Sequence, residues 1–207
     1  MFDDRKDAGR RLARGLEHHR GKDVVVLAIP RGGAEVGYEV ARHLGAELSI
    51  IVARKLPYPD EPEAGFGAVA EDGSLFISDR AALWLPRQTI ERIIEEQRRE
   101  AERRVRHLRG GRPLPDIKGR TVILVDDGIA MGSTMRAAIA LCRNHGATRI
   151  VVAAPVASRQ VADALAVLVD EVVILEMPRG FQAVAQVYRN WYDVSDEEVL
   201  EIVRSQG

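Results

Sequence analysis

Two adjacent acids and a run of small residues lie side by side in the second half of the chain. Asp126 and Asp127 follow four apolar residues, Val122 to Val125, whose pattern predicts a buried strand. The residues that come next are small or carry hydroxyls and lead into a predicted helix: Gly128, Ile129, Ala130, Met131, Gly132, Ser133 and Thr134. A loop of this kind offers free backbone N–H groups and the positive end of a helix dipole, which suits a phosphate.

The two carboxylates point to a different part of the same ligand. They repel a phosphate, so their natural partners are neutral hydroxyls or a divalent cation. A ribose 5-phosphate supplies both a phosphate and vicinal hydroxyls. An Asp-Gly turn with a helix cap would explain one acid and one hydroxyl residue, but not the whole run. The segment is not a Walker A loop, because no Gly-Lys-Ser/Thr occurs, and the glycines at 32, 33 and 37 lack dinucleotide-binding spacing.

Two other segments follow apolar runs in the same way. Pro30-Arg31-Gly32-Gly33 comes after the run 23–29, and the planar fork of Arg31 suits a diphosphate. An ordinary turn with a surface arginine is the alternative. Arg54-Lys55 closes the run 48–53 and precedes a proline-rich loop, which is either functional or simply solvated.

The elements around these segments alternate between strand and helix. Continuous apolar runs predict a parallel sheet covered by helices on both faces, and ligands of such sheets bind at the carboxyl ends of the strands. The predicted strands are 23–29, 48–53, 66–70, 75–77, 122–125, 149–155 and 171–175. The predicted helices are 4–20, 34–43, 80–109, 133–145, 159–168 and one that starts at Ser195, with Glu198 completing a capping box.

The run from Val122 to Thr134 resembles the signature of the type I phosphoribosyltransferases. The resemblance implies that fold and two roles: Asp126 and Asp127, as the catalytic pair, hold the ribose 2′ and 3′ hydroxyls, and Ala130, Met131, Gly132, Ser133 and Thr134 cradle the 5-phosphate. It also implies that Arg31, Gly32 and Gly33 form a pyrophosphate loop, with a cis peptide at Pro30-Arg31 or Arg31-Gly32. Lys55 would touch the pyrophosphate, and 56–66 would be a mobile loop that excludes water.

The same resemblance implies a reaction. The chain would use 5-phosphoribosyl-1-pyrophosphate and Mg²⁺ to transfer ribose 5-phosphate to a nitrogen acceptor, a nucleobase, with release of pyrophosphate. Mg²⁺ would be held through the substrate, with Asp126 or Asp127 reaching it through water. Position 131 is usually threonine in the family, so Met131 removes a hydroxyl donor. Ala130 replaces an aspartate of the 6-oxopurine enzymes, which argues against hypoxanthine–guanine specificity.

The predicted organisation is one domain over 1–207. Its core would comprise about 23–79 and 113–176, with a helical insert at about 80–112 and a hood from 1–20, 177–207 or both. The last segment gathers Phe181, Tyr188, Trp191 and Tyr192. These rings either stack on the acceptor base or pin the end of the chain to the core.

Composition restricts the remaining function classes. A formal net charge of -1 disfavours nucleic acid and anionic membranes as partners. A lone cysteine, Cys142, and a charged N-terminus without an apolar core favour a cytoplasmic protein. The five histidines show no metal-ligand spacing with cysteines or acids. Small-molecule partners are therefore expected, and homodimers are common for this fold. Two alternatives stay open: a non-catalytic regulator that senses phosphoribosyl pyrophosphate, and a hydrolase acting on a ribose 5-phosphate compound.

Overall fold

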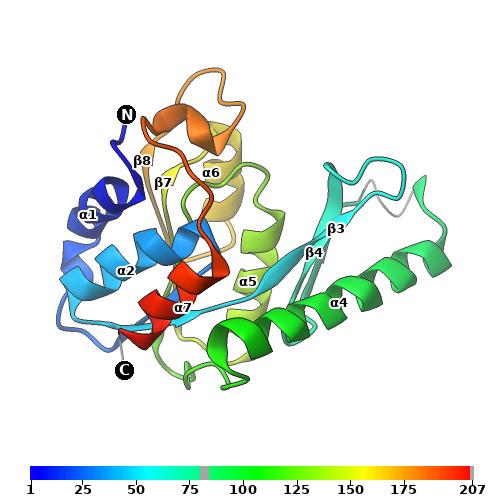
Figure 1. Ribbon diagram of the computed structural model, residues 1–207, viewed down its shortest axis with the longest axis horizontal. Coiled ribbons are helices and arrows are strands. Elements are labelled where there is room, and N and C mark those ends of the chain that lie inside the picture. The colour runs from blue at the N-terminus through cyan, green and yellow to red at the C-terminus, as the bar shows by residue number, and fades with distance from the viewer. Residues whose placement is uncertain (80–83, 206–207) are drawn as a thin grey trace.

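The chain is built around a sheet of five parallel strands. The computed structural model describes residues 1–79 and 84–205. The strand order is β2-β1-β6-β7-β8, from β2 (Glu47–Ile50), β1 (Val24–Ala28), β6 (Thr121–Val125), β7 (Arg149–Val156) and β8 (Glu171–Glu176). Figure 1 shows helices on both sides of this sheet. The predicted parallel α/β fold is therefore confirmed.

Alternate side chains of the strands pack into two separate cores. Val24, Val26 and Ile123 face α1 (Arg5–Gly15), α2 (Gly32–Leu44) and α7 (Asp196–Arg204). Val25, Val122 and Leu124 face α5 (Ser133–Asn144) and α6 (Arg159–Ala166). Because both faces are covered, nearly every strand residue is apolar, which is why the runs in the sequence were continuous.

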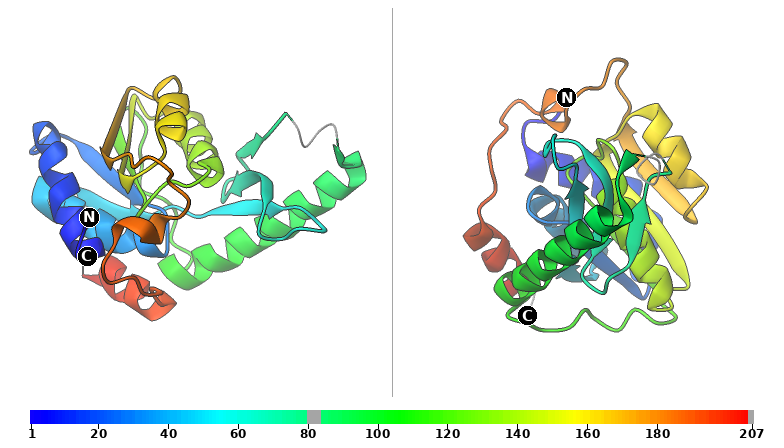
Figure 2. Two further views of the ribbon diagram at one scale, coloured as in Figure 1. Left: turned by 90° about the horizontal axis from the view of Figure 1, so that it is seen from above. Right: turned by 90° about the vertical axis from the view of Figure 1, so that its right-hand side faces the viewer.

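A second, antiparallel sheet extends from this core. It contains β3 (Ala53–Pro57), β4 (Gly65–Ala70) and β5 (Leu75–Ile77). The long helix α4 (Arg87–Arg109) packs along this sheet, with Ile93 in one apolar cluster with Leu56 and Phe66 of the strands. Figures 1 and 2 show α4 and these strands projecting together. The predicted strand 48–53 was wrong in extent, because β2 ends at Ile50 and Ala53 already begins β3. The predicted helix 80–109 was wrong in extent, because Leu85 and Pro86 are not helical and α4 begins at Arg87. The predicted start at 80 lies outside the described residues.

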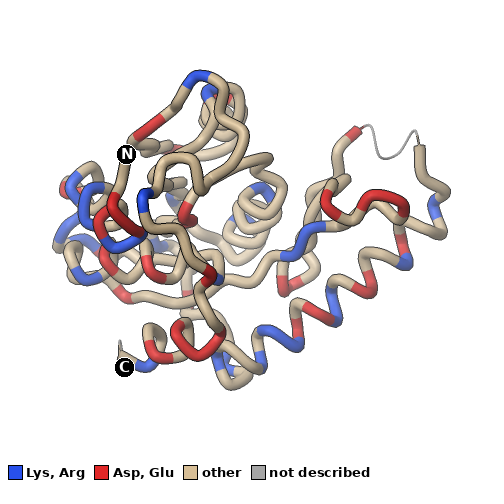
Figure 3. The backbone as a smooth tube through the Cα atoms, turned by 45° about the horizontal axis from the view of Figure 1, so that its top comes forward, with Lys and Arg blue, Asp and Glu red and all other residues tan. Residues whose placement is uncertain are grey.

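The exposed side of α4 alternates in charge, as Figure 3 shows. Arginines and glutamates pair along it at helical spacing, for example Arg92 with Glu96 and Arg99 with Glu95. These exposed pairs each contribute little to stability, so the helix is held mainly by its apolar stripe. No helix in the described parts of the chain is long and apolar enough to cross a membrane.

The N-terminal residues pair with the segment that follows β8, beside the carboxyl ends of the strands. Phe2 forms a parallel bridge with Tyr188, just after the short helix η2 (Val184–Val187), and its N–H donates to the carbonyl of Val187 at 2.7 Å. A second short helix, η1 (Glu17–His19), follows α1. Ser195 and Glu198 form the predicted capping box of α7. Both terminal segments thus contribute to the layer next to the candidate site.

Candidate functional site

The loop between β6 and α5 has the geometry of an anion-binding loop. Gly132 caps α5 in the left-handed conformation, with φ 76°, and no side chain caps this end of the helix. The first N–H groups of an uncapped helix have no intrahelical acceptor, so they are available to a ligand. The side chains of Ser133 and Thr134 are half buried at the same end, whereas Met131 is 80% exposed.

The loop after β1 lies directly against the two acids. A Cβ atom on Gly32 would lie only 1.9 Å from Oδ2 of Asp127, and one on Gly33 would lie 3.0 Å from the Cα of Asp126. A side chain at position 32 would therefore displace the Asp127 and Arg5 side chains. The peptide bond between Pro30 and Arg31 is cis, which is one of the two positions that the resemblance implied. The structure brings Gly32, Gly33, Asp126 and Asp127 together at one edge of the sheet.

The two predicted ligand-binding cations, Arg31 and Lys55, lie in different parts of the fold. Arg31 is the residue before α2, is exposed, and its Nη1 lies 4.0 Å from Oδ1 of Asp196 at the start of α7. Lys55 lies inside β3 of the second sheet, and its Nζ donates to the carbonyl of Glu63 at 2.6 Å. The prediction that Lys55 closes a strand of the main sheet was wrong. An apolar run cannot show where one sheet ends and another begins.

The most deeply buried charge at the site belongs to Arg5, which was not predicted as a site residue. Arg5, in the first turn of α1, is only 3% exposed. Its Nε donates to Oδ2 of Asp127 at 2.7 Å, and its Nη1 donates to the carbonyl of Tyr192 at 2.7 Å. Its guanidinium also lies over the ring of Trp191, 4.0 Å from the centroid. The sequence does indicate that Arg5 faces inward, because it continues the apolar series Ala8, Leu12 and Leu16 at helical spacing.

The C-terminal aromatic residues are held by hydrogen bonds around this arginine. The hydroxyl of Tyr192 donates to the carboxylate of Glu35 at 2.8 Å, and the hydroxyl of Tyr188 donates to the carbonyl of Asp127 at 2.6 Å. Tyr188 is buried, and its ring lies 5.3 Å from that of Trp191. Tyr188 and Tyr192 therefore anchor the end of the chain, while Trp191 keeps 42% of its surface exposed.

Burial raises the pKa of two acids in this cluster. Burial raises the pKa of Asp126 well above its usual range, and the neighbouring Asp127 carboxylate raises it further. The N–H of Asp127 donates to Oδ1 of Asp126 at 2.8 Å, which partly offsets that effect. Burial also raises the pKa of Glu35, against the opposing effects of Tyr192 and Arg5. The arginine thus faces several acids, and burial raises the pKa of two of them, Asp126 and Glu35.

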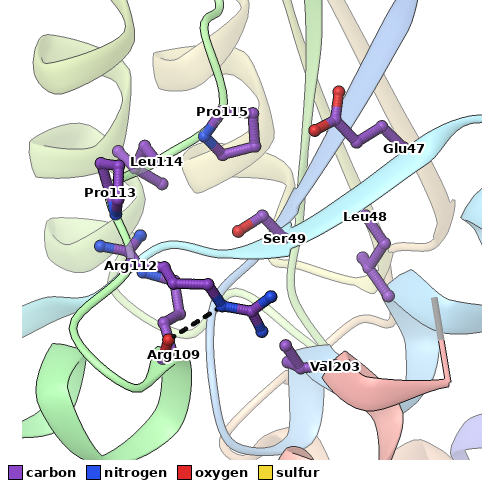
Figure 4. A pocket seen from close by; sticks show the side chains of 9 residues that line it. All are labelled: Glu47, Leu48, Ser49, Arg109, Arg112, Pro113, Leu114, Pro115 and Val203. Atoms are coloured by element: carbon purple, nitrogen blue, oxygen red, sulfur yellow. Dashed lines mark hydrogen bonds between the residues drawn. The ribbon is translucent and has the colours of Figure 1, made fainter. Parts of the chain in front are cut away.

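A separate cavity of about 420 Å³ lies at the opposite edge of the sheet (Figure 4). Glu47, the first residue of β2, lies on its wall, together with Leu48 and Ser49. Arg109 and Arg112, at the end of α4, close the other side. Because all strands of the main sheet run in parallel, this cavity is remote from the loop that follows β6.

Comparisons with known proteins agree with the fold. The family model described as the phosphoribosyl transferase domain matches residues 2–183. The provisionally named phosphoribosyl transferase Rv0571c of Mycobacterium tuberculosis is 43% identical over 202 residues, which cover 97% of this chain and 46% of the relative. The chain therefore spans about half the length of the curated relatives it matches.

Solved structures show the same architecture. The protein TT1426 from Thermus thermophilus superposes with a TM-score of 0.85 at 40% identity, over 100% of this chain and 99% of the other. A hypoxanthine-guanine phosphoribosyltransferase from Bacillus anthracis has a TM-score of 0.51 at 15% identity, over 90% and 89% of the two chains, and it supports the fold alone. Because the family model and these relatives match most of the chain, the chain belongs to the phosphoribosyl transferase domain family and has the type I fold of that family.

Proposed function

We propose that this chain binds 5-phosphoribosyl-1-pyrophosphate and transfers its ribose 5-phosphate to a nitrogen acceptor. The observation that carries the proposal is the meeting of two loops at the carboxyl edge of the sheet. Gly32 packs so closely on Asp127 that a side chain at position 32 would displace the carboxylate, and the uncapped start of α5 lies in the same loop as the acids. A sugar with a phosphate on one side and a diphosphate on the other matches that arrangement.

In this proposal each loop holds a different part of the substrate. The N–H groups at the start of α5, with the hydroxyls of Ser133 and Thr134, bind the 5-phosphate. Asp126 and Asp127 accept hydrogen bonds from the ribose hydroxyls, and the N–H groups of Gly32 and Gly33 point toward the diphosphate. The acceptor nitrogen then forms its bond to C1 as the bond from C1 to the pyrophosphate oxygen breaks. The chain contributes positioning and electrostatics.

Magnesium fits the donor set of this site. Mg²⁺ prefers carboxylate, phosphate and water oxygens, and it usually keeps several waters. Asp126 and Asp127 supply carboxylates within one loop, although Oδ2 of Asp127 already accepts from Arg5. When bound, the ion would neutralise charge on the diphosphate leaving group. We propose that Asp126 or Asp127 reaches the ion through water, because one oxygen of each carboxylate already accepts a hydrogen bond within the chain.

The test is phosphorus NMR of the full chain with phosphoribosyl pyrophosphate, Mg²⁺ and a mixture of free nucleobases. Pyrophosphate is expected only when bases are present, and omitting bases one at a time identifies the acceptor. Asp127→Asn should abolish turnover, whereas Asp163→Asn, at an exposed carboxylate on α6, should leave it unchanged. Unchanged spectra without any ligand binding would contradict the proposal.

One observation favours a second candidate, a regulator that binds the same ligand without turnover. Oδ2 of Asp127 is already paired with a buried arginine, so the pair that would hold the ribose is partly neutralised before the ligand arrives. The exposed Met131 likewise offers no hydroxyl to the phosphate. Broadened ligand signals without release of pyrophosphate, with every base present, would support the regulator.

A further inference from the structure

We propose that His18, His19 and Glu171 form a binding site for a divalent transition-metal ion of the zinc type. The site is independent of the proposed reaction, because it lies at the other edge of the sheet. Glu171 is the first residue of β8, whereas the phosphate loop follows the last residue of β6. Sequence spacing could not indicate this site, since about 150 residues separate the histidines from the acid.

The three side chains converge on a small volume. Nε2 of His18 lies 2.7 Å from Oε1 of Glu171, and Nε2 of His19 lies 3.1 Å from Oε2 of the same carboxylate. The ligand atoms all lie within 4.8 Å of one another. Ligands at about 2.0–2.1 Å from a tetrahedral zinc ion are roughly 3.3 Å apart, so a small movement of the rings admits the ion.

The chemistry of the set fits such an ion. Two imidazoles and a carboxylate match ions that prefer nitrogen and oxygen ligands, and they are poorly suited to Mg²⁺ or Ca²⁺. In the present contacts each Nε2 carries a proton that it donates to Glu171. On metal binding a neutral ring holds its proton on Nδ1, and the lone pair of Nε2 faces the ion. A neutral ring therefore exchanges its Nε2 proton for one on Nδ1 through solvent, with no net release of a proton.

The ligands are held by ordered backbone on both sides. His18 and His19 belong to η1, in which the N–H of His19 donates to the carbonyl of Leu16 at 2.9 Å. Glu171 pairs with Val151 in the parallel ladder of the sheet. The side chain of His19 is 4% exposed and that of His18 is 53% exposed. The site is therefore preorganised on one side and open to solvent for entry of the ion on the other.

Arg149 completes the surroundings of the carboxylate. Its Nη2 donates to Oε2 of Glu171 at 3.1 Å. Such an outer contact orients a ligating carboxylate and leaves Oε1 for the ion. The neighbouring cation lowers the affinity for a dication, so we expect a site of moderate strength. A bound ion would join the segment after α1 to the edge strand β8.

The proposal is tested on the untagged full chain by calorimetry with Zn²⁺ and by the visible absorption of Co²⁺. One ion per chain is expected, with the absorption of a low-coordinate Co²⁺ site. At a free Zn²⁺ concentration near 100 times the dissociation constant, the melting temperature should rise by about 5 °C or more, and EDTA should reverse the rise.

Two variants locate the site. His18→Gln changes an exposed side chain and should fold normally while losing stoichiometric binding and the thermal shift; Glu171→Gln should lose them too. His145→Gln, a half-exposed histidine outside the cluster, is the matched control and should bind as the unmodified chain does. Absence of stoichiometric binding, or binding that persists in His18→Gln, overturns the proposal.

Discussion

The Nε of Arg5 donates to Oδ2 of Asp127 at 2.7 Å, so a side chain of α1 reaches the loop that follows β6. The arginine is almost fully buried, and it also contacts Tyr192 and Trp191 near the other end of the chain. Both terminal segments are thereby tied to one carboxylate. The stability of the layer over the site and the charge of Asp127 are consequently linked.

Replacing Arg5 should destabilise the chain strongly. Removing one partner of a buried ion pair leaves an uncompensated charge, so Arg5→Ala should lower the free energy of unfolding by about 3–5 kcal/mol. Urea denaturation measures this value. Adding Asp127→Asn to Arg5→Ala should recover part of the loss, because the stranded charge is then removed. A cost near that of the exposed control Arg10→Ala would contradict the buried pair.

The stability of Asp126→Asn relative to the unmodified chain should depend on pH. Because the folded-state pKa of Asp126 is raised, the protonated carboxyl favours folding, and this contribution is lost as pH rises through the folded-state pKa. Below the ordinary value of 3.8 the two proteins should melt alike. Toward pH 7 the asparagine variant should melt at the higher temperature while binding phosphoribosyl pyrophosphate more weakly. Parallel melting curves at all pH values would show that Asp126 ionises without penalty.

Gly32→Ala should disrupt the proposed site through a steric clash. The added Cβ would lie 1.9 Å from Oδ2 of Asp127 and 2.7 Å from Nε of Arg5, so these two side chains or the loop must shift. Calorimetry should find a loss of phosphoribosyl pyrophosphate binding of at least about tenfold, the effect of about 1.4 kcal/mol. Gly15→Ala is the matched control, because its Cβ would meet only side-chain atoms, of Val173 at 3.3 Å and of Leu175 at 3.9 Å. Retained affinity in Gly32→Ala would place the diphosphate elsewhere.

Met131→Thr should strengthen binding of the phosphate. Met131 is 80% exposed, so the substitution removes no packing, and the new hydroxyl can donate to a charged phosphate. Hydrogen bonds to charged groups contribute about 1.5–3 kcal/mol, which corresponds to roughly tenfold or more in affinity. Val167→Thr, at an equally exposed position at the end of α6, should leave binding unchanged. Equal affinities for Met131→Thr and the unmodified chain would place the phosphate away from position 131.

The sequence by itself determined the parallel sheet and the loop that follows β6. Continuous apolar runs can be buried only between two layers of helices, and small residues after an acid pair predict a loop at the carboxyl edge. For these reasons the strands near Val24, Val122 and Arg149, and the capping box at Ser195, were predicted correctly. The pattern was local in every case, with the deciding residues adjacent along the chain.

Only the tertiary structure decided which distant residues join the loop. Arg5 reaches Asp127 across the fold, Lys55 belongs to a second sheet, and Glu171 meets His18 at the opposite edge. Local periodicity carries no information on such contacts, because it reports how a segment folds and not which segment lies beside it. A buried charge is stable only when its partner is placed by the packing of both elements, so the fold had to be known before the site was complete.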